Sequence, residues 1–110
     1  MEITSVELKQ KIENGEKVLV DFHGVWCGPC KVMKPIFEKI ANQMEEEGSK
    51  VQMYTMDVDN NRELASELGL RSIPTIKGFS NGKEIVSEVG FKQKDAILVD
   101  PNYKSGGTLY

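Results

Sequence analysis

A nearly continuous apolar run from Val18 to Phe22 leads into a pair of cysteines, and this junction constrains the fold more than any other part of the chain. Such a run is typical of a strand that is covered on both faces. One carboxylate, Asp21, interrupts it. The helical pattern that follows opens on the motif Trp26, Cys27, Gly28, Pro29 and Cys30. The junction therefore predicts a buried strand that passes into a helix with two thiols at its first turn.

The position of the two cysteines predicts a disulfide that opens and closes. Unpaired N–H groups and the positive end of the macrodipole favour thiolate over thiol at a helix start, so we expect Cys27 to be the nucleophile. Cys30 follows on the same helical face, where its sulfur can reach the first one. Pro29 costs no hydrogen bond in a first turn, because the N–H it lacks would be unpaired there.

A metal site and a structural bridge are the alternatives for this cysteine pair. The chain has no other cysteine and its only histidine is His23, so the ligands of a zinc or iron site cannot be completed. A purely structural bridge would close too small a loop to stabilise the fold much. We therefore expect redox chemistry and no metal.

Composition limits the remaining possibilities. A chain of 110 residues has room for one hydrophobic core. Its formal net charge of -3 argues against a nucleic acid or an anionic membrane as the main partner. Charged residues interrupt residues 1–10, and no run has membrane-spanning length, so we expect no signal peptide and no membrane span. A cysteine pair without an export signal fits a reducing compartment, and the predicted location is the cytoplasm.

The remaining patterns give the order of the other elements. Thr4 and Glu7 have the spacing of a capping box, which opens a short first helix that ends at Asn14 and Gly15. Asn81 with Gly82 marks a hairpin turn in the second half of the chain. The periodicity adds a second central strand at 51–58, a short helix that Gly69 ends, hairpin strands at 75–79 and 84–89, and a last helix at 93–99 before Pro101.

This order and these motifs resemble the thioredoxin family over about residues 2–99. The residues that carry the resemblance are Asp21, Phe22, Trp26 to Lys31, Pro35, Ile73 to Thr75, Asn81, Gly82 and Gly90. The resemblance implies an α/β thioredoxin fold with a central mixed sheet of four to five strands flanked by helices. It also implies a thioredoxin domain at 1–100, a flexible tail at 101–110 and a cis peptide bond before Pro74. Taken alone, Pro74 would be read as an ordinary turn proline.

The function that the resemblance implies is the reduction of protein disulfides by dithiol–disulfide exchange, with Cys27 as nucleophile and Cys30 as resolving thiol. It implies a monomer that binds no cofactor, uses the Cys27–Cys30 disulfide as its redox group, and is recharged by an NADPH-dependent flavoprotein reductase or another dithiol donor. Disulfide-containing proteins are the expected substrates. They would dock on a flat apolar rim formed by Trp26, Gly28, Pro29, Gly90 and Phe91. The Ile73 backbone, turned by Pro74, could pair with an extended substrate strand beside Cys27.

Asp21 is the candidate proton acceptor. A carboxylate inside an apolar strand is costly unless it is paired, hydrated or protonated, so burial should raise its pKa. In the family, the matching aspartate accepts the proton of the resolving cysteine through water. The alternative is a hydrogen-bonded carboxylate with a purely structural role.

Three positions depart from the family pattern. Thr55 stands where a lysine is common beside that aspartate, so no cation is available there to ease ionisation of Asp21. His23 replaces a tryptophan and, when protonated, would favour the Cys27 thiolate; the alternative is a simple packing substitution. Lys77 and Gly78 interrupt an otherwise apolar strand.

Two other functions remain open at this stage. A domain of this kind can serve as a binding module or processivity subunit for a partner protein, with the cysteines incidental. It can also act as a disulfide oxidase or isomerase, because the direction of electron flow depends on the reduction potential and not on the motif alone.

Overall fold

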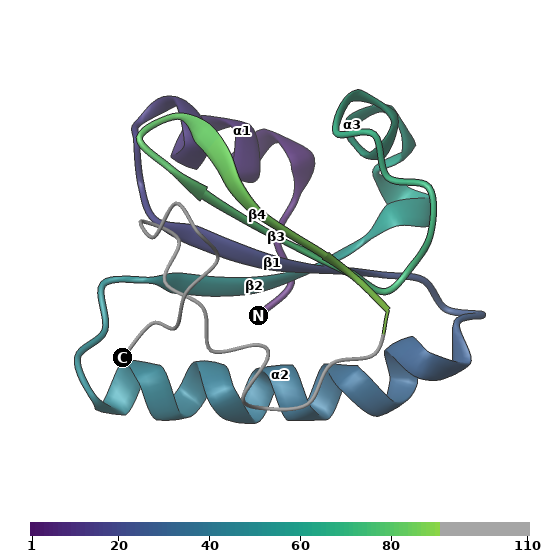
Figure 1. Ribbon diagram of the computed structural model, residues 1–110, viewed down its shortest axis with the longest axis horizontal. Helices are drawn as coiled ribbons and strands as arrows, with labels where there is room; N and C mark the ends of the chain where they lie inside the picture. The colour runs from purple at the N-terminus through teal and green to yellow at the C-terminus, as the bar shows by residue number, and fades with distance from the viewer. Residues whose placement is uncertain (91–110) are drawn as a thin grey trace.

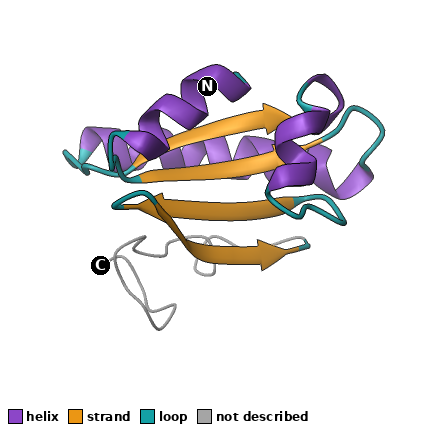
Figure 2. Cartoon of the chain, turned by 90° about the horizontal axis from the view of Figure 1, so that it is seen from above, coloured by secondary structure: helices purple, strands orange, loops and turns teal. Residues whose placement is uncertain are grey.

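Strand β1 (Val18–His23) lies inside a four-stranded sheet, and all six of its residues are buried. The computed structural model describes residues 1–90, so Phe91, the predicted helix at 93–99 and the tail at 101–110 lie outside the described residues. The other strands are β2 (Gln52–Asp57), β3 (Thr75–Ser80) and β4 (Lys83–Val89), and they give the order β2-β1-β3-β4. The β1–β2 pair is parallel and the β1–β3 and β3–β4 pairs are antiparallel, which confirms the predicted mixed sheet (Figure 2).

Helices cover both faces of the sheet (Figure 1). The long helix α2 (Gly28–Glu46) runs along one face, and α1 (Ser5–Glu13) and α3 (Arg62–Glu67) lie on the other. A short 3-10 helix, η1 (Val58–Asn60), connects β2 to α3. The predicted capping box of α1 is present, because Thr4 and Glu7 each bond the other's backbone N–H.

Successive side chains of β1 point to opposite faces of the sheet, and each face has its own cluster of buried apolar residues. Val18, Val20 and Phe22 belong to the cluster that includes Leu8 of α1 and Leu64 of α3. Leu19 points the other way, into the cluster formed with α2. That second cluster contains Leu19, Met33, Phe37, Ile40, Met44, Met53 and Ile76. Since successive strand residues alternate between faces, Asp21 and His23 share the face of Leu19, which α2 covers.

Lys77 and Gly78 are accommodated within β3 by their neighbours on β4. The side chain of Lys77 is buried, and its Nζ donates hydrogen bonds to Glu84 Oε1 at 2.9 Å and to Ser87 Oγ at 3.2 Å. At position 78, a Cβ atom would lie 3.1 Å from both Leu19 Cδ1 and Val86 Cβ. A buried lysine is tolerated because its charge is paired, and glycine leaves space for two side chains of the core.

The first residues of the chain lie against the outer edge of β2, an arrangement that the sequence patterns do not predict. Thr55 N–H donates to Met1 O at 2.9 Å, and Ile3 N–H donates to Thr55 O at 2.8 Å. Glu2 thereby forms a parallel bridge with Thr55. This edge of the sheet is consequently covered by the chain itself.

The position of Leu8 predicts a large loss of stability on truncation. We expect Leu8→Ala to lower the free energy of unfolding by about 2–5 kcal/mol, because it leaves a cavity beneath α1. Val6→Ala on the same helix is the matched control, since Val6 is 67% exposed and surface substitutions usually stay within about 0.5 kcal/mol. Urea denaturation of the oxidised proteins measures both, and equal effects would contradict the assignment of the core.

Candidate redox site

Cys27 and Cys30 form a disulfide at the start of α2, with their Cα atoms 5.1 Å apart. Cys27 is the N-cap residue and has an extended backbone, and its Sγ accepts a hydrogen bond from the Cys30 N–H at 3.1 Å. The prediction that both cysteines lie in the first turn is therefore off by one residue for Cys27. The N-cap position still places its sulfur among the unpaired N–H groups of the helix end.

The two sulfurs differ in their access to solvent. Cys30 is 2% exposed, whereas Cys27 is half-buried. Trp26, directly before the pair, is 83% exposed. An incoming disulfide therefore meets Cys27 before Cys30.

Three loops meet around the exposed side of the pair. The indole Nε1–H of Trp26 donates to Asp59 Oδ2 at 2.9 Å. Both side chains lie near Gly24, where an added Cβ would sit only 2.8 Å from Ile73 Cδ1. Glycine at position 24 thus lets the loop before the cysteines approach the loop that contains Ile73.

The loop at residues 73–74 contains the expected cis peptide bond, between Ile73 and Pro74. Gly90, which has a φ of 92°, donates its N–H to Pro74 O at 2.8 Å. The backbone N–H and C=O of Ile73 have no hydrogen-bond partner among residues 1–90. Gly90 therefore lies beside Pro74, and Ile73 lies beside the loop that contains Trp26. The backbone N–H and C=O of Ile73 are left available for a partner.

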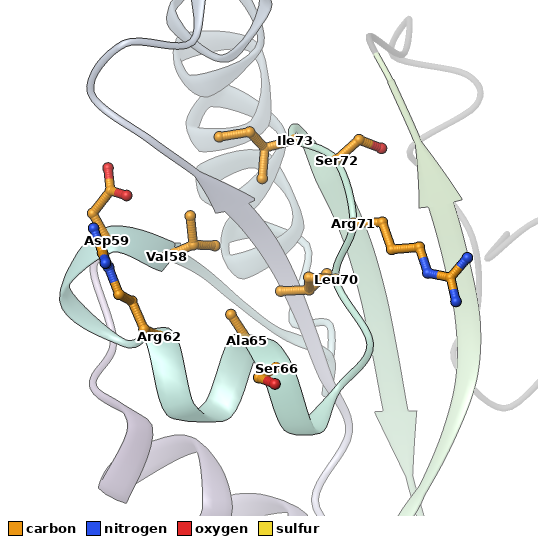
Figure 3. A pocket seen from close by; sticks show the side chains of 9 residues that line it. All are labelled: Val58, Asp59, Arg62, Ala65, Ser66, Leu70, Arg71, Ser72 and Ile73. Atoms are coloured by element: carbon orange, nitrogen blue, oxygen red, sulfur yellow. The ribbon is translucent and has the colours of Figure 1, made fainter.

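A pocket of about 380 Å³ adjoins this loop (Figure 3). Its lining residues are Val58, Asp59, Arg62, Ala65, Ser66, Leu70, Arg71, Ser72 and Ile73. In Figure 3 the Arg62 side chain extends toward Asp59, whereas Arg71 points away from both. The pocket shares Asp59 and Ile73 with the surroundings of the cysteines. Its walls come from separate segments, so no single sequence pattern signals it.

Asp21 is fully buried and neither of its carboxyl oxygens has a hydrogen-bond partner in the described part of the chain. Burial raises the pKa of Asp21 to about 6, as the sequence predicts, although the His23 charge opposes the increase. Lys34 and Glu38 of α2 also act on this carboxyl electrostatically. Asp21 therefore faces the helix that carries Cys30, in surroundings that favour its protonated form.

His23 is 8% exposed, and its ring Nε2 lies 3.0 Å from Glu2 Oε1. The same carboxyl oxygen accepts a bond from Thr55 Oγ1 at 2.6 Å, and Oε2 accepts the Asp57 N–H at 2.6 Å. Burial alone would raise the pKa of Glu2, but the hydrogen bonds from Thr55, His23 and Asp57 lower it overall. Sequence reasoning identified His23 and Thr55 but missed Glu2, because its partners are distant in the chain.

Residues 1–90 also bear on metal binding and on membrane insertion. This part of the chain contains no group of three or more His, Cys, Asp or Glu side chains placed to hold a metal ion. None of its helices is both long and apolar enough to cross a bilayer.

Known proteins share a similar sequence and fold with this chain. The thioredoxin family model matches residues 1–100. A thioredoxin of Rickettsia felis is 41% identical over 90 residues, which cover 82% of this chain and 83% of the relative. A thioredoxin of Malassezia sympodialis is 43% identical over 89 residues, 80% of this chain and 83% of the relative.

Solved structures agree with this result. A mutant thioredoxin from Halobacterium salinarum superimposes with a TM-score of 0.73 at 34% identity, covering 86% of this chain and 80% of that one. The range of the family model includes the Cys27–Cys30 disulfide, and this pair supports dithiol–disulfide exchange. The chain belongs to the thioredoxin family of protein-disulfide reductases.

Proposed function

We propose that the chain reduces protein disulfides with Cys27 as the attacking thiolate and Cys30 as the resolving thiol. The observation that carries this assignment is the difference in access, because the half-buried Cys27 can be approached and Cys30 cannot. The helix N-terminus also supports Cys27 as the nucleophile, because the Cys30 N–H donates to the Cys27 sulfur. Hydrogen bonds of this kind favour the thiolate.

The exchange proceeds in two displacements. The Cys27 thiolate attacks one sulfur of the client disulfide, and the other client sulfur leaves as a thiolate that takes up a proton. Cys30 then gives up its proton and attacks Cys27 Sγ, which breaks the mixed disulfide and releases the second client thiolate. The client gains two electrons, and the enzyme ends with the Cys27–Cys30 disulfide seen in the structure.

Asp21 is the acceptor that we propose for the Cys30 proton. It lies on the sheet face that α2 covers, and Lys34, which acts on its charge, is one helical turn beyond Cys30. Its pKa of about 6 lies closer to neutral pH than that of an ordinary aspartate. A carboxyl of this kind can take up and release a proton near physiological pH.

The rim around Cys27 is the proposed docking surface for clients. Exposed Trp26, Gly28 and Pro29 supply one side, and the unpaired backbone of Ile73 supports pairing with an extended client strand next to Pro74. Gly90 completes the surface beside Pro74. Clients with an exposed disulfide in an extended segment fit this arrangement.

The proposal extends to the setting in which the chain works. We infer a monomeric domain at residues 1–100 that acts in the cytoplasm on protein disulfides. A flavoprotein reductase that draws on NADPH, or another dithiol donor, would return the Cys27–Cys30 disulfide to the dithiol. The family membership supports this cycle, in which the chain itself binds no cofactor.

Insulin reduction tests the activity. We expect the wild-type chain, supplied with NADPH and a candidate flavoprotein reductase, to reduce insulin disulfides. The Cys27→Ser, Cys30→Ser double variant should be inactive, because no thiol remains to carry the electrons. If the double variant still performs the biological role of the chain in a complementation assay, a binding-module function is correct instead.

Single variants test the order of the two displacements. Cys30→Ser should accumulate a mixed disulfide between Cys27 and insulin, visible as a covalent adduct on a non-reducing gel, because the resolving thiol is missing. Cys27→Ser is the matched control and should form no adduct, since Cys30 is buried. Adducts on Cys30 alone would reverse the assignment.

The raised pKa of Asp21 predicts a pH-dependent stability. A carboxyl whose pKa rises from 3.8 to about 6 on folding stabilises the folded state below pH 3.8, and this contribution is lost as the pH rises through 6, by about 3 kcal/mol in total. Asp21→Asn cannot ionise, so its advantage over wild type should grow across this range. Urea denaturation of both proteins at several pH values measures it, and a constant difference would contradict the buried, unpaired state.

A further inference from the structure

The N-terminal segment brings a charged group to the buried side of the redox site. Backbone hydrogen bonds hold Met1 and Ile3 against Thr55 of β2. The side chain of Glu2 therefore lies next to Thr55, which is the register partner of Asp21 across the β1–β2 pair. Thr55 is 1% exposed, whereas 47% of the Glu2 side chain remains exposed. Glu2 thus connects the buried face to solvent.

The hydrogen bonds of Glu2 fix the protonation of one ring nitrogen of His23. The lowered pKa of Glu2 makes it a carboxylate, which only accepts hydrogen bonds. His23 Nε2, 3.0 Å from Glu2 Oε1, must therefore carry a hydrogen. Thr55 Oγ1 and the Asp57 N–H donate to the same carboxylate, so Glu2 holds its position independently of His23.

His23 in turn lies beside Asp21. The two residues are separated by one position in β1 and project from the same face. Neither oxygen of Asp21 has a hydrogen-bond partner within residues 1–90. Its proton is consequently controlled by nearby charges and by burial, and not by a fixed donor.

Charges from three elements act on Asp21. His23 on β1 and Lys34 on α2 favour its ionised form, whereas Glu2 at the N-terminal edge and Glu38 on α2 oppose it. Of these groups, Glu2 and His23 form an ion pair when the imidazole is protonated. Lys34 and Glu38 come from the helix of Cys30 and form no ion pair with either of them.

We propose that Glu2 is a positioning residue for disulfide exchange, which holds the His23 imidazole beside Asp21 so that the pair controls proton transfer from Cys30 to Asp21. The pair lies next to Thr55, which bonds Glu2 and is the register partner of Asp21. This inference rests on the proposed role of Asp21 as proton acceptor. It assigns to an N-terminal side chain a part in chemistry that takes place at the start of α2.

Substitutions of Glu2 and His23 should shift the pKa of Asp21 in opposite directions. Glu2→Gln removes a negative charge, and its amide oxygen can accept from the Asp57 N–H while its amide nitrogen donates to Thr55 Oγ1, so the pKa of Asp21 should fall. His23→Gln removes an imidazole that favours the ionised form of Asp21 when it is protonated, and it keeps a donor for Glu2, so the pKa of Asp21 should rise. A purely structural role for the two residues would instead admit water to Asp21 in both variants and lower its pKa in both.

Carbon NMR of the Asp21 carboxyl in the oxidised proteins measures these shifts without interference from thiol titration. Glu7→Gln is the matched control for net charge, because Glu7 lies in the exposed cap of α1; it should leave the Asp21 titration unchanged. Thermal unfolding followed by circular dichroism verifies that each variant is folded. Unchanged Asp21 titrations in both test variants, or shifts in the same direction, would overturn the proposal.

A kinetic readout separates this inference from the function on which it rests. The reduced protein reacts with dithiobis(nitrobenzoate), and the attack of Cys30 on the Cys27 adduct releases the second thionitrobenzoate. The pH midpoint of that release should move down in Glu2→Gln and up in His23→Gln, and it should vanish in Asp21→Asn. If Asp21→Asn keeps the wild-type profile, the role of Asp21 itself is wrong. If Asp21→Asn loses it but the other two variants match wild type, only the present inference is wrong.

Discussion

Burial of β1 on both faces is the constraint on which the rest of the structure depends. The strand pairs with β2 on one side and β3 on the other, and its side chains enter both core clusters. The chain therefore leaves the sheet at the carboxyl end of β1, and the loop that follows leads into α2 with Cys27 as its N-cap. The same burial raises the pKa of Asp21, because this carboxyl is shielded from solvent and has no hydrogen-bond donor among residues 1–90.

The site separates its functions by depth. Cys27, Trp26 and the Ile73 backbone lie where a client can touch them. Cys30 and Asp21 lie beneath, and solvent does not reach either. In the proposed mechanism, the first displacement depends on client geometry, whereas the second depends on groups that the client does not contact. The charges of His23, Glu2, Lys34 and Glu38 act on the Asp21 carboxyl, which is the proposed proton acceptor.

The strongest sequence patterns predicted the fold and most of the site. The apolar run of β1, the helical pattern after the cysteines and the turn at Asn81 and Gly82 are local signals, and each corresponds to an element of the structure. The pairing of residues 1–3 with β2 was missed because three residues are too few to show periodicity. Their hydrogen bonds are to Thr55, which is distant in the sequence. The pocket beside Ile73 was missed because η1, α3 and the loop at residues 70–73 together supply its walls. Contacts of this kind depend on how elements pack, which local patterns do not encode.

The contact between Glu2 and β2 also bears on the order in which the molecule is assembled. Two partners of Glu2, Thr55 and Asp57, lie 53 and 55 positions downstream, whereas His23 follows it by 21 positions. The ribosome therefore makes this carboxylate well before its partners on β2, and its contacts with that strand form only after β2 has been made. Both thiols are synthesised in the interval. A nascent chain thus carries its cysteines before the surroundings of Asp21 are complete, and oxidation at that stage would take place without the mature control of the proton.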